Sequence, residues 1–402
     1  MLRGVRVLLA TTCTPDDRKT LCAARALARR GVRVSVGSDR LRGLACWSRA
    51  VAERLRYPHP GREPGPFLRR LERLLDANRH DVIIPVDDCT TAAVAAHAGE
   101  LSALVHMAVP EVESQARAHD KLAIVALGRE LGIDTPRTLL AETDDEIRQA
   151  AAGIGCPCVV KFRRGSGAVG LRVLRRPGDW RSDDKNRREP DPVFDGLQYL
   201  VQERVPGDTH DVCAVVRHGE MRAAMTQRRL RTYPAAGGVG IDCVTTDEPG
   251  LVERATALMR ALRWHGPAQI EFKVDAASGR AWLIEINGRL WGTLALADWA
   301  GIDVPWMLCR MALDGDVDLQ TRYRIGARYR WLLPLGLLHA AQSGAAWQAL
   351  WSFVAPSRDT GGDWRWSDPS PHAAEAVYAL QRMWGRGRLG PERRLPLEGG
   401  SP

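Results

Sequence analysis

The stretch Ala281-Trp-Leu-Ile-Glu-Ile-Asn-Gly-Arg289 decides the fold of this chain. Its apolar residues predict a buried strand, in which Glu285 and Asn287 share one face because side chains alternate along a strand. The segment Gln269-Ile-Glu-Phe-Lys273 lies just upstream, and a turn-like segment separates the two. We therefore expect an antiparallel strand pair that places Glu271 beside Glu285 and Asn287.

These three side chains predict a metal site. A buried pair of carboxylates is costly unless a cation neutralises it. Carboxylate and amide oxygens are hard ligands that suit Mg²⁺, which keeps several waters and completes its coordination with substrate phosphates. The predicted ligands are therefore Glu271, Glu285 and Asn287. The alternative is a half-exposed hairpin with solvated acids, because short motifs also match by chance.

The composition indicates a globular protein of two or three domains. The chain has 402 residues, of which 45% are hydrophobic and 26% charged. Its net charge of +9 comes from arginines spread along the sequence, without a basic block interleaved with aromatics, so we expect no nucleic-acid partner. Nine scattered cysteines predict reduced thiols, and the chain begins with the strand-like Val5–Ala10 rather than a secretion signal. A cytoplasmic protein is expected.

The N-terminal region alternates apolar strands with helices. Val5–Ala10, Val32–Val36 and Asp81–Val86 are separated by helical segments, which predicts an open parallel sheet. The loops Thr11–Asp17 and Asp87–Thr90 follow two of these strands at their carboxyl ends, where ligands usually bind. The alternative for the second loop is a helix N-cap. The first strand is not followed by G-x-G-x-x-G, which disfavours a dinucleotide site.

The middle of the chain contains a pattern that is typical of phosphate binding. Lys161 lies in an apolar strand, and the glycine-rich, basic loop Arg163–Gly170 follows it. Backbone N–H groups of such a loop can lie over phosphates, although glycine-rich hairpins also occur for structural reasons. The charged segment 175–196 predicts a mobile excursion before a strand at Leu200–Gly207. Arg229 and Arg231 lie in a later basic segment that can bind a carboxylate or remain solvated.

In this order, the motifs resemble the ATP-grasp superfamily, within its carboxylate–amine ligase branch related to the carbamoyl-phosphate synthase large subunit. The resemblance covers residues 1 to about 320. It implies an α/β architecture, the ATP-grasp fold, with an N-terminal open parallel-sheet domain before it and a mostly helical C-terminal extension. The implied domains are 1–112, then 113–320 with a lid subdomain at about 135–206, and 321–402.

The resemblance also implies a role for each matching position. Lys121 and Lys161 would hold the α- and β-phosphates of ATP, and the glycine-rich loop would close over the triphosphate. The backbone at Glu203 and Val205 would read adenine, and Arg289 would face the γ-phosphate or the acyl phosphate. Arg229, Arg231 and Arg289 are the catalytic candidates. The nucleotide-binding candidates are Lys121, Lys161, Gly165, Ser166, Gly167, Gly170, Gln202, Glu203, Val205 and either Asp208 or Asp211 for the ribose.

The implied activity is ATP-dependent ligation of a carboxylate to an amine through an acyl phosphate, with release of ADP and phosphate. The alternatives are a kinase or carbamoyl-phosphate-type phosphorylating enzyme and a nucleotide-binding regulator without turnover. The implied cofactors are ATP and Mg²⁺, with Mn²⁺ as a substitute. Small-molecule acids and amines are the expected partners, and related enzymes are often homodimers. The uncharged stretch 331–357 is expected to form buried helices or a surface segment rather than a membrane span.

Overall fold

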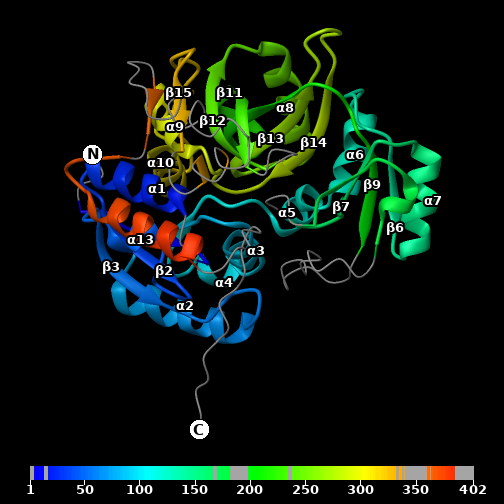
Figure 1. Cartoon of the computed structure of the whole chain (residues 1–402). Coiled ribbons are helices and arrows are strands. Elements are labelled where there is room, and N and C mark those ends of the chain that lie inside the picture. The colour runs from blue at the N-terminus through cyan, green and yellow to red at the C-terminus, as the bar shows by residue number, and fades with distance from the viewer. Residues whose placement is uncertain are drawn as a thin grey trace.

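A computed structural model describes residues 4–12, 17–165, 170–181, 198–233, 238–331, 335–336, 339, 360–362 and 364–384. Three β-sheets organise the described chain, and helices pack around them (Figure 1). The first is an open parallel sheet, which confirms the expected α/β class. The charged segment 182–196 and residues 340–357 of the uncharged stretch lie outside the described residues.

The N-terminal sheet has the strand order β3-β2-β1-β4-β5, and all its pairs are parallel. Successive residues of β1 enter different cores: Leu9 packs with Leu27 in one cluster, and Leu8 packs with Leu71 in another. Helices therefore cover both faces, as the continuous apolar runs predict. The elements are β1 (Arg6–Ala10), α1 (Arg18–Arg29), β2 (Arg33–Ser38), η1 (Leu44–Trp47), β3 (Val51–Arg56), α2 (Pro64–Asn78), β4 (Val82–Pro85), α3 (Asp88–Ala96), α4 (Ala98–Leu101) and β5 (His106–Met107).

The largest sheet has seven strands in the order β14-β13-β10-β11-β12-β15-β16. Its strands β13 and β14 are antiparallel with Glu271 opposite Glu285, which confirms the expected strand pair. One face packs on α5 (Val112–His119), α6 (Lys121–Glu130) and α8 (Pro249–Ala261). The strands are β10 (Asp208–Arg217), β11 (Glu220–Tyr233), β12 (Val239–Thr246), β13 (Gly266–Val274), β14 (Ala281–Asn287), β15 (Arg328–Arg330) and β16 (Thr360–Gly361).

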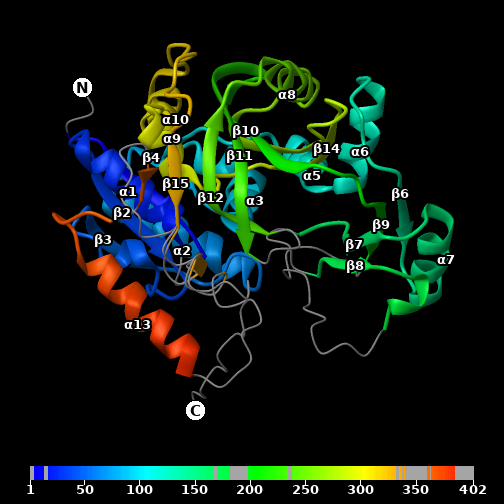
Figure 2. The ribbon, with the colours of Figure 1, turned by 45° about the horizontal axis from the view of Figure 1, so that its top comes forward.

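A small antiparallel sheet lies at the other end of the molecule from the N-terminal sheet (Figures 1 and 2). Its order is β6-β9-β7-β8, and α7 (Asp144–Ile154) packs on it. Its strands are β6 (Thr138–Ala141), β7 (Cys158–Phe162), β8 (Arg172–Leu174) and β9 (Tyr199–Glu203), with the short η2 (Pro177–Asp179) after β8. All of them fall within the segment expected to form a lid, and the domain boundaries themselves stay a prediction.

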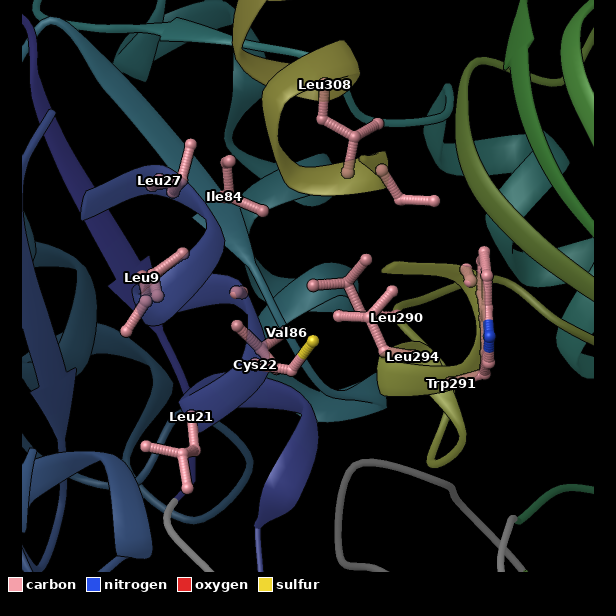
Figure 3. Close-up of a cluster of buried hydrophobic side chains, with 14 of the residues drawn as sticks. Leu9, Leu21, Cys22, Leu27, Ile84, Val86, Leu290, Trp291, Leu294 and Leu308 are labelled. Atoms are coloured by element: carbon pink, nitrogen blue, oxygen red, sulfur yellow. The ribbon is translucent and has the colours of Figure 1, made fainter. Parts of the chain in front are cut away.

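The N-terminal sheet and the large sheet share a hydrophobic core. Leu9 and Ile84 of the first sheet face Leu290, Leu294 and Leu308 across this cluster (Figure 3). The last three side chains belong to or adjoin α9 (Leu294–Ala300) and α10 (Val304–Asp314), which follow the strand pair of β13 and β14. The N-terminal sheet is therefore packed against the helices that directly follow the strands carrying the predicted metal ligands.

A C-terminal helix returns to the N-terminal sheet. The helix α13 (Ser370–Trp384) lies along the side of that part of the molecule (Figure 2). Just before it, Asp368 accepts hydrogen bonds from Arg25 Nε at 2.9 Å and Ser48 Oγ at 2.5 Å. This part of the expected helical extension thus packs on the body of the protein.

Two further findings concern membrane-spanning helices and cysteines. None of the described helices is both long and apolar enough to cross a membrane. Eight of the nine cysteines lie in the described residues, and these eight form no disulfide with one another.

Candidate functional site

A cavity of about 840 Å³ lies between the small sheet, the large sheet and the start of α1. The small sheet contributes β7 and the end of β9, the large sheet contributes β13 and β14, and the start of α1 contributes from the N-terminal part. Most of the predicted site residues line it: Lys121, Lys161, Gly165, Gln202, Glu203, Val205, Arg229, Glu271, Glu285, Asn287 and Arg289. The chain therefore brings together residues that are up to 168 positions apart, from Lys121 to Arg289.

The predicted metal ligands lie side by side on one wall of the cavity. Glu271 is opposite Glu285 in the strand pair, and Asn287 Nδ2 donates to Glu285 Oε1 at 3.1 Å. Within the described residues, no group of three or more histidine, cysteine, aspartate or glutamate side chains can hold a metal. The strand pair itself offers two carboxylates and an amide oxygen, the kind of incomplete oxygen shell that Mg²⁺ completes with water and phosphates.

The two carboxylates differ in their electrostatic environment. Burial, reinforced by the charge of Glu285, raises the pKa of Glu271 to about 7, although Arg229 acts in the opposite direction. Burial also acts to raise the pKa of Glu285, but Lys121 and Lys161 outweigh it and lower that pKa. A buried like-charge pair of this kind fits a divalent cation, because the cation would stabilise both ionised carboxylates.

The two predicted phosphate-binding lysines approach this wall from different elements. Lys121, the first residue of α6, donates to the carbonyl oxygen of Gly165, and its Nζ lies 3.6 Å from Glu285 Oε2. Lys161 lies on β7 and is 6% exposed. Burial lowers the pKa of Lys161 to about 8, with Glu285 acting in the opposite direction. These ammonium groups can neutralise a bound polyphosphate.

Nucleotide affinity should fall as the pH rises above about 8, because Lys161 loses its charge there. Its protonated form attracts phosphates, and this form dominates only below the pKa. Because binding is coupled to one proton, the affinity can fall by at most about tenfold per pH unit. Calorimetric titration with Mg²⁺-ADP across this range measures the effect. Lys161→Arg, which keeps its charge, should flatten the profile, whereas an equal slope in that variant would assign the proton to another group.

The expected adenine end of the cavity is more apolar. Pro157, Val159 and Ile284 line it together with Gln202 and Glu203. The side chains of the last two are already engaged, since Gln202 Nε2 donates to Thr138 Oγ1 at 2.8 Å and the Arg137 N–H donates to Glu203 Oε2 at 3.1 Å. A base between these walls would therefore meet apolar surfaces and backbone groups.

The glycine-rich loop is only partly described. Gly165 lines the cavity, whereas Ser166 and Gly167 lie outside the described residues. Gly170 has a φ of +72°, and a Cβ at this position would lie 2.3 Å from the ring of Phe162. Glycine is therefore required at 170 by the turn and by the close ring, and Gly170 does not itself line the cavity.

Neither ribose candidate lines the cavity. The side chain of Asp208 is 68% exposed and lies 4.0 Å from Arg228. Asp211 is fully buried, and it accepts from Gln227 Nε2 at 2.7 Å and from Arg229 Nε at 2.9 Å. Asp211 is thus placed to hold Arg229, and Thr209, between the two aspartates, is the residue of this strand that lines the cavity.

The structure separates the two arginines that the sequence placed in one basic segment. Arg229 lines the cavity and forms ion pairs with Asp211 and Glu271. A β-bulge follows, so that Arg229 is opposite Cys243 while Arg231 is opposite the adjacent residue Asp242. Because neighbours along β12 point to opposite faces, the bulge turns Arg231 to the other face of the sheet. Arg231 does not line the cavity.

The substitution Arg229→Met should lower the free energy of unfolding by about 3 to 5 kcal/mol, because it leaves Asp211 buried without its cation. Urea denaturation measures the loss. The double variant Arg229→Met, Asp211→Asn should lose less than the sum of the two single variants, since the unpaired charge is then absent. A loss below about 1 kcal/mol, which is typical of an exposed pair, would contradict the assignment.

Arg289 connects the metal wall to the N-terminal sheet. Its Nη2 donates to Asn287 Oδ1 at 3.0 Å, and its Nε donates to Asp88 Oδ2 at 3.1 Å. Asp88 is the first residue of α3, and the preceding Asp87 is the N-cap, with a capping box to Thr90. The expected N-cap is thus confirmed for Asp87, whereas Asp88 reaches into the site.

The end of the cavity beyond Arg289 was missed by sequence reasoning. Arg18 and Lys19, in the first turn of α1, line it together with Trp331 and Leu335. Arg18 lies 4.6 Å from the centre of the Trp331 ring and forms a buried ion pair with Glu375 of α13. The loop before α1 was expected at a ligand-binding edge, but the return of the C-terminal helix has no local sequence signal.

Comparison with known proteins agrees with this architecture. Residues 197–333 match a family described as "ATP-grasp in the biosynthetic pathway with Ter operon". The chain is 32% identical to carnosine synthase 1 of Gallus gallus over 166 residues, which are 37% of this chain and 17% of that protein. It is also 32% identical over 242 residues to formate-dependent phosphoribosylglycinamide formyltransferase of Anaeromyxobacter dehalogenans, covering 54% of this chain and 56% of that protein. The chain thus spans less than two thirds of the length of these relatives.

The fold also matches a solved structure, the biotin carboxylase–β,γ-ATP complex from Campylobacter jejuni. The TM-score is 0.62 at 15% identity, and the match covers 80% of this chain and 74% of that one. At this identity the likeness concerns the fold. Together with the family match over residues 197–333 and the arrangement of the three sheets, it shows that the chain has the ATP-grasp fold.

Proposed function

We propose that this protein is an ATP-dependent ligase that joins a carboxylic acid to an amine. One observation carries the proposal: a single cavity brings together Lys121, Lys161, Glu271, Glu285, Asn287 and Arg289. The lysines and Arg289 can neutralise a triphosphate, and the acids can hold its cation. The site contains the groups needed for phosphoryl transfer, which depends mainly on positioning and on neutralising charge.

The proposed reaction has two steps. An oxygen of the acid attacks the γ-phosphorus of ATP, and ADP leaves, which gives an acyl phosphate. The amine nitrogen then attacks the acyl carbon and loses a proton, and phosphate leaves with the attacking oxygen of the acid. The phosphate makes the carboxyl carbon electrophilic, so the protein itself need not supply a nucleophile.

Each group of residues has a part in this scheme. Lys121 and Lys161 would bind the phosphates, and Arg289 would stabilise the charge on the transferred phosphoryl group. Glu271, Glu285 and Asn287 would hold Mg²⁺, which supplies Lewis-acid polarisation of the phosphates when it is bound. The small sheet would exclude water, which protects an acyl phosphate from hydrolysis.

The end of the cavity beside α1 would bind the acid. Lys19 is half-buried there, and burial, reinforced by Arg289, lowers its pKa. Trp331 and Leu335 provide an apolar wall next to it. A carboxylate could thus lie between Lys19 and Arg289 while an apolar or aromatic part of the substrate packs on the indole ring.

The test is ADP release from Mg²⁺-ATP with a panel of amino acids and small carboxylic acids, alone and in pairs, using hydroxylamine as a surrogate amine. The proposal predicts ADP release that depends on one class of acid, together with a hydroxamate. ADP release without hydroxamate would favour a phosphorylating enzyme. A failure to bind ATP would overturn the proposal.

Other parts of the proposal concern the setting of the reaction. We propose Mg²⁺ as the resident cation, with Mn²⁺ as a substitute. We also propose a cytoplasmic location, with which the eight described cysteines outside disulfides agree, because disulfides are rare in reducing compartments. A homodimer stays a prediction that sedimentation of the full chain would test.

A further inference from the structure

We propose that the face of the large sheet opposite the cavity carries a separate oxyanion-binding site, formed by Arg231, Arg328 and Arg330 around Asp242. The site would take the phosphate or carboxylate group of a small molecule. It does not depend on the proposed ligase activity, because it shares no residue with the cavity.

Strand register places the four side chains together. Asp242 on β12 is opposite Arg231 on β11 and opposite Arg330 on β15. Arg328 lies two residues before Arg330 and is opposite Val244, which lies two residues after Asp242. Paired residues share a face of a sheet, and so do residues two positions apart along a strand. All four side chains therefore lie on one face, across three neighbouring strands.

The single carboxylate in this group is already occupied. Asp242 is fully buried, and both its oxygens accept from Arg328, at 2.7 Å from Nε to Oδ1 and at 2.6 Å from Nη2 to Oδ2. This is the two-pronged geometry by which arginine binds carboxylates. Arg330 Nε remains 3.8 Å from Asp242 Oδ2, which is beyond hydrogen-bond distance. Asp242 thus compensates Arg328 well and Arg330 only at longer range.

Arg330 is the side chain that most directly indicates a bound ligand. It is 11% exposed, and its Nε and Nη1 are buried with no hydrogen-bond partner in the structure as described. Burial and the charge of Arg328 lower the pKa of Arg330, Asp242 acts in the opposite direction, and Arg231 lowers it further. Buried guanidinium donors without an acceptor are costly. An oxyanion here would accept from those donors and offset the charge of Arg330.

The chemistry of the donors defines the ligand class. Guanidinium groups present planar pairs of N–H donors that match the oxygens of phosphate and carboxylate groups. Arg328 is 29% exposed, so a small molecule can reach the group from solvent. The site also lies behind the strands β11 and β12, whose other face carries Arg229 toward the cavity.

The test is calorimetric titration of the full chain with sodium phosphate and, separately, with sodium malonate at constant ionic strength. We expect a binding component, distinct from any binding in the cavity, that weakens at least about tenfold in Arg330→Met. The matched control is Arg322→Met, which removes an exposed arginine a few residues upstream and should leave that component unchanged. Anion binding in the cavity would persist in both variants, so it does not confuse the comparison.

A second variant covers the case in which Arg330→Met does not fold. Arg330→Lys keeps the charge but loses the planar pair of donors, and it should bind with reduced affinity. If only phosphate binds, the ligand carries a phosphoryl group. If malonate also binds and its affinity falls equally in the Arg330 variants, the ligand carries a carboxylate. The proposal is overturned if neither anion binds at millimolar concentration, or if the folded Arg330 variants bind as the unsubstituted protein does.

Discussion

ATP turnover by Glu285→Gln is expected to fall by more than about 100-fold. Glu285 faces Glu271 across the strand pair and lies 3.6 Å from Lys121 Nζ, so its charge serves both the predicted cation and the phosphate-binding lysine. Glutamine has the same shape and keeps an oxygen, but it lacks the negative charge. Steady-state ADP release at saturating Mg²⁺-ATP and substrate measures the effect.

A matched control separates the loss of charge from loss of the fold. Glu253→Gln makes the same change on the exposed side of α8, and its turnover should equal that of the unsubstituted protein. Thermal unfolding of both variants should remain cooperative. If Glu285→Gln turns over ATP as fast as the control does, the assignment of this wall as the metal site is wrong.

Arg289→Ala is expected to lower kcat by about 100-fold or more, with a much smaller change in the Kd for ATP. Arg289 is held by Asp88 and Asn287 at the end of the cavity where the transferred phosphoryl group would lie. An interaction made mainly in the transition state affects kcat more than ground-state binding. Single-turnover kinetics together with equilibrium binding of ATP separate the two quantities.

Two further substitutions define how Arg289 acts. Arg289→Lys keeps the charge but not the geometry, so it should recover part of the lost rate. Asp88→Asn should lower kcat in the same direction by a smaller factor, because Asp88 only positions the guanidinium. If Arg289→Ala weakens ATP binding as much as it slows turnover, Arg289 binds the ground state and the proposed role is contradicted.

The central strand pair could be predicted from the sequence, because its signal is local. The alternation in Ala281–Asn287 and the turn before it fix the face and the partner of Glu285, and the structure confirms the pairing with Glu271. The parallel N-terminal sheet has a similar basis in continuous apolar strands such as β1. Features that depend on the alternation of side chains along a strand and on turn residues can thus be predicted from the sequence.

The features that the sequence did not predict arise from irregular backbone or from distant contacts. Two-residue spacing suggests that Arg229 and Arg231 point the same way, but a bulge between them reverses the second side chain. The sequence suggested a helix cap at Asp88, yet its side chain contacts Arg289, which lies 201 positions away. Likewise, the pairing of Arg18 with Glu375 joins the two ends of the described chain. Such contacts depend on how the sheets pack and leave no local pattern.

The fate of one carboxyl oxygen atom tests the proposed acyl phosphate most directly. The acid identified by ADP release is labelled with ¹⁸O in its carboxyl group, and the mass of the released phosphate is measured after a single turnover with hydroxylamine. Activation as an acyl phosphate predicts that one carboxyl oxygen appears in the phosphate. Unlabelled phosphate released with the coupled product would show that water or another group attacked ATP, and it would contradict the proposed chemistry.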